Sequence, residues 1–308
     1  MPEIEKNNDE NEKLANLFTK EIFCDSDSEE FFDYCHYRYK PCCDFLGKLR
    51  SINLLNESLN KFLNKHLVEK NLKIIKKIQT ELGIKKTVWG IKKLGSKIAW
   101  EYYFYNYQKK NALIKFENVI KTVSPEILFN GSLNENIPYF MFSIDISKEI
   151  LESGKIDCAH IYLNPPSNRP AGISYILTEN KTEMENIYHF YNPKKELNEL
   201  YNKIRKSAFV DLEKIELKEI LWPELTDCKS ICIANKKETD CIYYSGIDYE
   251  QFIYFLERLE YPLELVEYIK SNSDRLNHLQ YDVGFDYCFE KEGTEKLKII
   301  KSGYYGIF

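Results

Sequence analysis

The spacing of apolar residues divides the chain into two parts. Up to Leu82 they recur every three or four positions, which predicts helices at 14–22, 29–39, 52–67 and 72–82, the last ended by Gly83. Residues 1–12 are polar and acidic, and we expect them to be disordered.

After Gly83 the period changes to two, which is typical of strands. Ten strands are predicted, at 87–94, 97–107, 139–146, 158–164, 172–179, 186–192, 229–236, 241–247, 279–289 and 296–308. Helices are predicted between them at 113–123, 147–153, 194–207 and 249–272, the last with Asp248 as its N-cap.

The strands have two unlike faces. In 97–107, Trp100, Tyr102 and Phe104 share one face, while Glu101 and Tyr103 share the other with Ala99, Tyr105 and Tyr107. The same division predicts Tyr139, Met141, Ser143 and Asp145 on one face of 139–146, and Cys158, His160 and Tyr162 on one face of 158–164. An aliphatic face suits packing under helices, and a phenolic face suits a wet or ligand-filled interior.

These elements predict an α+β fold, in which helices surround a ten-stranded antiparallel β-barrel built from repeated αββα units. We expect a single domain over 13–308, with a helical lead-in at 13–83 and helix–hairpin repeats at 84–308. An open antiparallel sheet with one solvated face is the alternative at this point.

Composition and charge narrow the class of protein. The 23 Tyr are too many for a purely apolar core, because a buried phenol needs a hydrogen-bond partner. The net charge of −5 argues against a nucleic-acid partner, and no apolar stretch is long enough to span a membrane. The acidic start does not resemble a signal peptide, and nine Cys without such a leader predict reduced thiols and a cytoplasmic protein.

Glu101 is the leading catalytic candidate, because a carboxylate among phenols inside a barrel could act as a general base. Asp145, Asp282 and Asp286 are weaker candidates of the same kind. No metal site is predicted, since the cysteines and the histidine at 24–43 lack the paired spacing of zinc ligands.

The closing stretch 229–308 resembles the ABBA-type aromatic prenyltransferases, nearest the cyanobactin-type peptide prenyltransferases. It runs Ser-Ile-Cys-Ile-Ala, Cys-Ile-Tyr-Tyr-Ser, the helix at 249–272, Tyr281-Asp-Val-Gly-Phe-Asp-Tyr and Ile300-Lys-Ser-Gly-Tyr-Tyr-Gly-Ile-Phe. The strand Trp100–Tyr107 adds a shorter match. The resemblance implies transfer of an isoprenyl group, inside the barrel, from an allylic diphosphate to an aromatic small molecule or peptide side chain.

The resemblance also implies roles for individual residues. Glu101 would be the base, and the implied tyrosine shield around the allyl cation is Tyr103, Tyr162, Tyr175, Tyr243 and Tyr304. The implied diphosphate anchors are Lys93, Arg169, Lys236 and Lys301, with His160 where the family often has the lysine of Lys-x-Tyr. Participation of Mg2+ stays open.

Two other functions are compatible with the same sequence. The barrel could bind an aromatic or isoprenoid ligand or a peptide without catalysis, or the tyrosines could form an exposed interaction surface. Convergence of several cationic side chains in the lumen would favour the enzyme.

Overall fold

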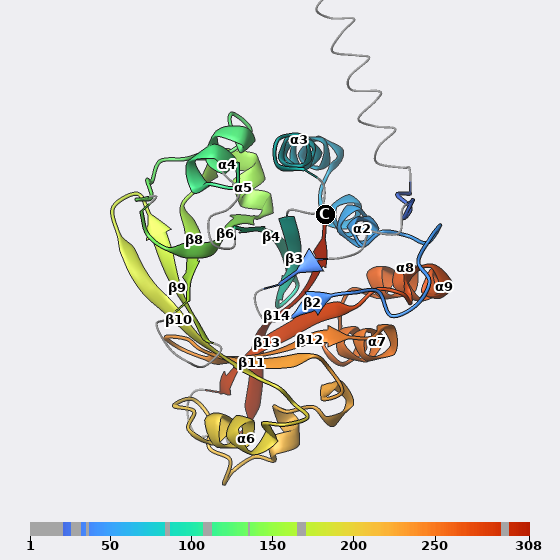
Figure 1. Ribbon diagram of the computed structural model, residues 1–308, viewed down its shortest axis with the longest axis vertical. Helices are drawn as coiled ribbons and strands as arrows, with labels where there is room; N and C mark the ends of the chain where they lie inside the picture. Colours follow the sequence, from blue (N-terminus) through green and yellow to red (C-terminus); the bar gives the residue numbers. More distant parts are fainter. Residues whose placement is uncertain are drawn as a thin grey trace, which may run out of the picture.

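Ten strands of the chain close into one antiparallel barrel (Figure 1). The computed structural model describes residues 21–25, 32–34, 37–83, 87–106, 113–134, 136–164, 171–290 and 296–308. The strands are β3 (Thr87–Leu94), β4 (Lys97–Tyr105), β6 (Tyr139–Ile146), β8 (Cys158–Leu163), β9 (Ala171–Thr178), β10 (Thr182–Tyr191), β11 (Ser230–Asn235), β12 (Asp240–Ile247), β13 (Tyr281–Phe289) and β14 (Leu297–Ile307). All ten lie where the sequence predicts strands, and closure between β14 and β3 rules out the open sheet.

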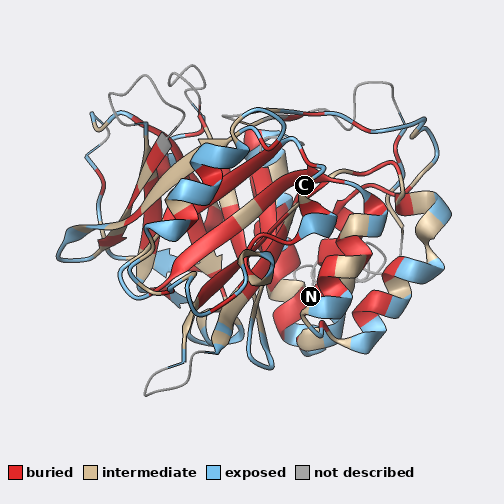
Figure 2. Ribbon diagram, turned by 90° about the horizontal axis from the view of Figure 1, so that it is seen from below, coloured by how far each residue is buried: buried red, intermediate tan, exposed pale blue. Residues whose placement is uncertain are grey.

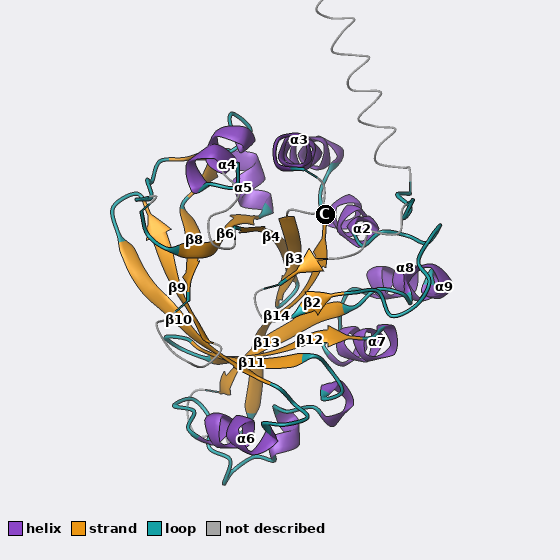
Figure 3. Cartoon of the chain, viewed as in Figure 1, coloured by secondary structure: helices purple, strands orange, loops and turns teal. Residues whose placement is uncertain are grey.

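The helices lie outside the barrel (Figures 1 and 3). They are α2 (Ile52–Phe62), α3 (Lys65–Leu82), α4 (Phe116–Val123), α5 (Lys148–Ser153), α6 (Leu197–Arg205), α7 (Tyr249–Arg258), α8 (Leu263–Ser271) and α9 (Ser273–Leu276), with 3-10 turns η2 (Leu217–Glu219) and η3 (Pro223–Leu225). Short strands β1 (Phe32–Asp33) and β2 (Arg38–Tyr39) pair with each other, as do β5 (Leu128–Phe129) and β7 (Lys155–Ile156).

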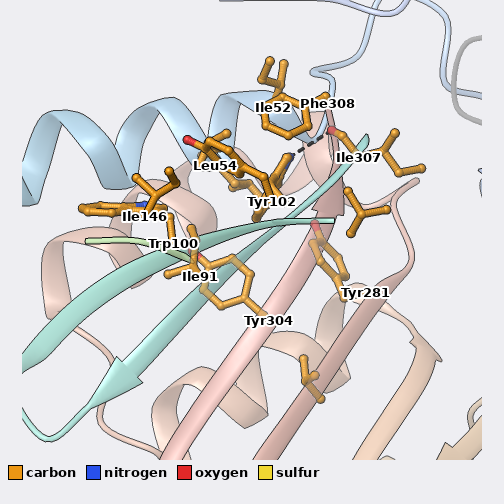
Figure 4. Close-up of a cluster of buried hydrophobic side chains, with 14 of the residues drawn as sticks. Ile52, Leu54, Ile91, Trp100, Tyr102, Ile146, Tyr281, Tyr304, Ile307 and Phe308 are labelled. Carbon is orange, nitrogen blue, oxygen red and sulfur yellow. Dashed lines mark hydrogen bonds between the residues drawn. The ribbon is translucent and has the colours of Figure 1, made fainter. Parts of the chain in front are cut away.

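The main hydrophobic core lies between the barrel and this helical coat. Figure 4 shows Trp100 and Tyr102 of the barrel among side chains of α2, and Figure 2 shows the strands mostly buried. The polar tips are paired: Trp100 Nε1 donates to Ser58 Oγ (2.8 Å), and the Tyr102 hydroxyl donates to Asn71 Oδ1 (2.8 Å). The outer face of β4 is therefore structural, which leaves its inner face for chemistry.

Several helix predictions need correction. The helix expected at 29–39 is wrong, because β1 and β2 lie there and Phe32 packs edge-on against Tyr105 (ring centroids 5.4 Å apart). The break expected between 67 and 72 falls earlier, where Asn64 caps α3 by accepting the Leu67 N–H. The helix expected at 249–272 is divided by Pro262, whose ring cannot continue a helix from the preceding residues.

Three other predictions lie outside the described residues or partly so. These are the disordered stretch 1–12, most of the helix at 14–22, and the extension of the second strand to Tyr107.

Candidate active site in the barrel lumen

Alternation along the strands decides which side chains enter the lumen. On β4, Trp100, Tyr102 and Phe104 are fully buried against the helical coat, while Glu101 and Tyr103 lie on the inner face. This confirms the predicted division of β4 and places its carboxylate inside the barrel.

On β6 the division holds with one exception at the start of the strand. A register irregularity between Tyr139 and Met141 reverses the faces on which Tyr139 and Phe140 lie. Phe140 therefore lines the lumen, while Tyr139 packs outward on Phe142 with ring centroids 5.8 Å apart. The predicted inner position of Tyr139 is wrong for this reason.

Five tyrosines form a closed ring across the lumen, which we call the tyrosine belt. They are Tyr103 on β4, Tyr162 on β8, Tyr188 on β10, Tyr243 on β12 and Tyr305 on β14. Successive ring centroids around the belt are 6.4, 6.0, 6.5 and 6.4 Å apart, and Tyr305 closes on Tyr103 at 5.7 Å. Every second strand of the barrel contributes one of these tyrosines, so the belt is a layer of aromatic rings.

The intervening strands make room for the belt with small side chains. The cross-strand partners of the belt tyrosines include Gly90 on β3, Ser143 on β6, Gly172 on β9, Cys232 on β11 and Gly284 on β13. A Cβ on Gly284 would lie 2.4 Å from the Tyr243 ring, and one on Gly90 would lie 2.8 Å from the Tyr305 ring. Alternation of large and small residues therefore builds the layer.

The belt has a polar side and an apolar side. The Tyr103 hydroxyl donates to Glu101 (2.5 Å), and the Tyr188 hydroxyl accepts from Asn186 (3.1 Å). The Tyr162 hydroxyl lies 3.4 Å from Ser143 Oγ. These partners all lie on the side of the belt nearer the β3–β4 hairpin, which we call the lower lumen. The opposite side is the upper lumen.

The upper lumen is aromatic and covered. A cavity of about 130 Å³ lies there, lined by Tyr34, Tyr105, Phe140, Phe190 and Asp282 together with the belt. Tyr34 and the nearby Tyr37 belong to the β1–β2 segment, and the Tyr37 hydroxyl donates to Asp282 (2.5 Å). Burial raises the pKa of Asp282 to about 6, although the Tyr37 hydroxyl and the Gly246 N–H favour its ionised form.

The lower lumen holds Glu101, whose side chain is 3% exposed. Besides the Tyr103 hydroxyl, it accepts a hydrogen bond from the Ser143 hydroxyl and forms an ion pair with Lys92. Lys92 Nζ also contacts Asp145 Oδ1 (2.8 Å). Burial disfavours the charged amine, but Asp145 and Glu101 outweigh it and raise the pKa of Lys92 well above its usual value.

His160 lies between two carboxylates of the lower lumen. Its Nδ1 is 2.9 Å from Glu185 Oε2, and its Nε2 is 3.3 Å from Asp145 Oδ2. Burial lowers the pKa of His160, but hydrogen bonds with Asp145, Cys158 and Glu185 outweigh this and raise it well above its usual range. The imidazole is therefore held as a cation at neutral pH.

Lys236 and Lys301 complete the cationic side chains that meet below the belt. Lys236 Nζ contacts both carboxylate oxygens of Asp286 at 2.8 Å. Lys301 makes no ion pair with any described residue, and the positive charge of Lys92, then burial, then Lys236 lower its pKa. Repulsion by Lys92 and Lys236 thus contributes to the lowered pKa of Lys301, and an anion bound beside the three amines would relieve it.

The predicted site residues divide between lumen and outer face. Glu101, Tyr103, His160, Tyr162, Lys236, Tyr243 and Lys301 meet in the lumen. Arg169 lies outside the described residues.

Three predicted lumen residues point outward instead. Lys93 Nζ lies 5.9 Å from the centre of the Tyr261 ring. Tyr304 packs on Trp89 of β3 and on Phe252 of α7, and Figure 4 labels it among the buried core side chains. Tyr175 pairs with the outward Ile161, on a strand that has no helix over it in Figure 1. Each prediction is wrong because the chosen residue is one position along the strand from a residue that points into the lumen.

The sequence analysis missed several lumen residues. Most of them could have been found by counting every second residue along a strand from one that is known to point inward. Lys92 and Tyr305 are the immediate neighbours of the mispredicted Lys93 and Tyr304. Tyr188 is harder to find, since an irregularity between Met184 and Asn186 shifts the register of β10.

Among the described residues, Asp145, Cys158 and His160 are the group with ligand atoms close enough to hold a metal ion, all within 4.8 Å of one another. No helix in the described part of the chain is long and apolar enough to cross a membrane.

The crystal structure of AnaPT from Neosartorya fischeri is similar to this chain, with a TM-score of 0.51 and 12% sequence identity. The similarity covers 83% of this chain and 92% of AnaPT. The fold is the ABBA prenyltransferase barrel. At this identity the likeness concerns the fold alone.

Sequence comparison adds one distant relative. A protein of Acanthamoeba polyphaga mimivirus, described as JmjC domain-containing, is 23% identical over 288 residues, which cover 79% of this chain. The match covers 44% of the viral protein, so this chain spans less than half of its length. No family model matches the chain.

Proposed function

We propose that this barrel transfers an isoprenyl group from an allylic diphosphate to an aromatic small molecule or a peptide side chain. The observation that carries the proposal is the closed tyrosine belt directly above a cluster of buried lysines. The belt would surround a carbocation with ring faces, and the lysines would hold the anion that leaves it.

The diphosphate would bind in the lower lumen, around Lys301. This lysine has no carboxylate partner among the described residues, and Lys92 and Lys236 are near enough to lower its pKa. His160 is balanced by Asp145 and Glu185, so the proposal relies on the three lysines. A bound diphosphate would relieve their mutual repulsion.

The reaction would begin when the allylic C–O bond breaks and its electron pair leaves with the diphosphate. Each tyrosine face near the allyl cation would stabilise it by about 0.5–2 kcal/mol, since the site is shielded from water. The acceptor's electron pair then forms the new bond to the allylic carbon. Its proton passes to Glu101, which the Tyr103 hydroxyl connects to the belt.

The size of the cavity adds a condition to this proposal. A cavity of about 130 Å³ is similar in size to an engineered cavity of about 150 Å³ that holds one benzene ring. An isoprenyl chain with its acceptor therefore needs the belt or the β1–β2 segment to move aside on binding. Ligand binding should accordingly change the environment of the belt tyrosines.

The charge balance of the lower lumen favours a second candidate, a barrel that binds an aromatic or isoprenoid ligand or a peptide without catalysis. Four carboxylates, those of Glu101, Asp145, Glu185 and Asp286, equal in number the four cations Lys92, His160, Lys236 and Lys301, although Lys301 forms no ion pair with a described residue. The third possibility, an exposed tyrosine surface, receives no support from tyrosines that lie inside the barrel.

The deciding experiment is incubation with dimethylallyl, geranyl and farnesyl diphosphate plus tyrosine- or tryptophan-containing peptides and small aromatics, with and without Mg2+. Mass spectrometry would detect an acceptor heavier by one isoprenyl group. Diphosphate binding by calorimetry without product formation would favour the second candidate. Absence of both binding and product with every donor would contradict the proposed function.

A further inference from the structure

We propose that Asp145, Cys158 and His160 form a binding site for one divalent transition-metal ion of the zinc class. The three side chains offer an oxygen, a sulfur and a nitrogen ligand at the lower end of the lumen. The inference goes beyond the proposed transfer reaction and does not rest on it, because it concerns metal binding alone.

The barrel strands hold the three side chains in place. Cys158 and His160 are two residues apart on β8 and so project from the same face, while Asp145 lies on the adjacent strand β6. Their ligand atoms lie within 4.8 Å of one another. Ligands of one tetrahedral zinc lie about 3.5 Å apart at bond lengths of about 2.0–2.3 Å, so small side-chain rotations would close the site.

His160 is oriented as a metal-binding histidine. Its Nδ1 is 2.9 Å from Glu185 Oε2, and Ser174 Oγ donates to that same carboxylate oxygen at 3.3 Å. In the metal-free imidazolium both ring nitrogens carry a proton, so a metal ion would displace the proton of Nε2, on the side of Asp145, while Nδ1–H continues to donate to Glu185. Carboxylates hold metal-binding histidines in this way in many zinc sites.

Asp145 is held by an outer contact as well. Lys92 Nζ contacts its Oδ1 at 2.8 Å, which leaves Oδ2 on the His160 side, 3.3 Å from Nε2. The Asp145 side chain is 32% exposed, so the site opens to solvent and has a path for the metal to enter. Solvent could also supply a fourth ligand, as at zinc sites with three protein ligands.

The thiol distinguishes this group from an ordinary ion-pair network. The carboxylates, His160 and Lys92 would balance one another without any cysteine. Cys158 adds a soft sulfur donor to nitrogen and oxygen, a combination that suits zinc and cobalt and not magnesium or calcium.

The test is a titration of the chelator-treated full chain with Co2+, followed by competition with Zn2+. We expect one cobalt per chain, with a near-ultraviolet thiolate-to-cobalt absorption that zinc abolishes. Cys158→Ser should remove that absorption, while Cys288→Ser, which changes another half-buried thiol, should leave it. Glu185→Gln should weaken binding about 10- to 100-fold without removing the absorption.

Circular dichroism of each variant would show that the barrel remains folded. The proposal is overturned if the folded parent shows no thiolate–cobalt absorption, or if Cys158→Ser keeps it. Because prenyl donors are absent from this titration, its outcome is separate from that of the transferase assay.

Discussion

The upper and lower halves of the lumen share ten strands but differ in almost every property. Above the belt, aromatic side chains surround a small cavity, and the β1–β2 segment covers Asp282. Below it, ion pairs link Lys92, Glu101 and Asp145, and the site opens toward solvent. One layer of five tyrosines therefore separates two chemical environments within one barrel.

The largest effect should follow from removing Glu101, the proposed general base in the lower lumen. Glu101→Gln keeps the shape of the side chain but cannot accept a proton, so turnover should fall about 10²- to 10⁴-fold. Product formation measured by mass spectrometry would test this, with circular dichroism as the control for folding. Undiminished turnover would exclude Glu101 from the mechanism.

The tyrosine belt itself can be disrupted at Tyr243. Tyr243→Ala should open a hole in the belt and lower the free energy of unfolding by about 2–4 kcal/mol, because its packing partners are lost. Tyr243→Phe keeps the ring and should cost less than about 1 kcal/mol. Denaturant unfolding of both variants tests the pair, and equal losses would show that the hydroxyl, not the ring, matters.

The upper half should respond to pH through Asp282, whose pKa is raised by burial to about 6. Between pH 4 and 6 the folded chain binds more protons than the unfolded chain, so stability falls as the pH rises through this window. The loss is up to about 3 kcal/mol for a shift of roughly two pKa units.

Asp282→Asn removes this titration, and subtracting its stability curve from that of the parent isolates the contribution of Asp282. Urea unfolding at several pH values provides both curves. Parallel curves for the two proteins between pH 4 and 6 would contradict a raised pKa.

The smallest effect is expected outside the lumen, at Tyr304. Its buried hydroxyl has no hydrogen-bond partner in the described structure, so Tyr304→Phe should be neutral or stabilise by up to about 1 kcal/mol. By contrast, the Tyr244 hydroxyl contacts the backbone of Ile220 and Trp222, and Tyr244→Phe should destabilise. Thermal unfolding compares the two, and a clear loss at Tyr304 would reveal a partner such as water.

The barrel could be predicted from the sequence because period-two patterning is a local property of each strand. All ten strands and the inner position of Glu101 follow from it. The helix at 29–39 could not be corrected in this way, because β1 and β2 depend on tertiary contacts such as that of Phe32 with Tyr105.

The site was harder to predict because a shift of one residue reverses the face of a strand. Lys93 was chosen where Lys92 points inward, and Tyr304 where Tyr305 does. Irregularities at Met141 and Asn186 shift two further strands, and no local pattern marks them. Pairing across strands, which only the fold supplies, settles these positions.

The direction of the strands has a consequence for the orientation of a bound ligand. In a closed antiparallel barrel of ten strands, every second strand runs the same way, so the five belt tyrosines project alike. The hydroxyls of Tyr103, Tyr162 and Tyr188 accordingly meet polar partners on one side. A ligand with a charged group at one end and an apolar chain at the other would therefore fit in a single orientation. Its charged group would lie in the lower lumen and its apolar chain in the upper lumen.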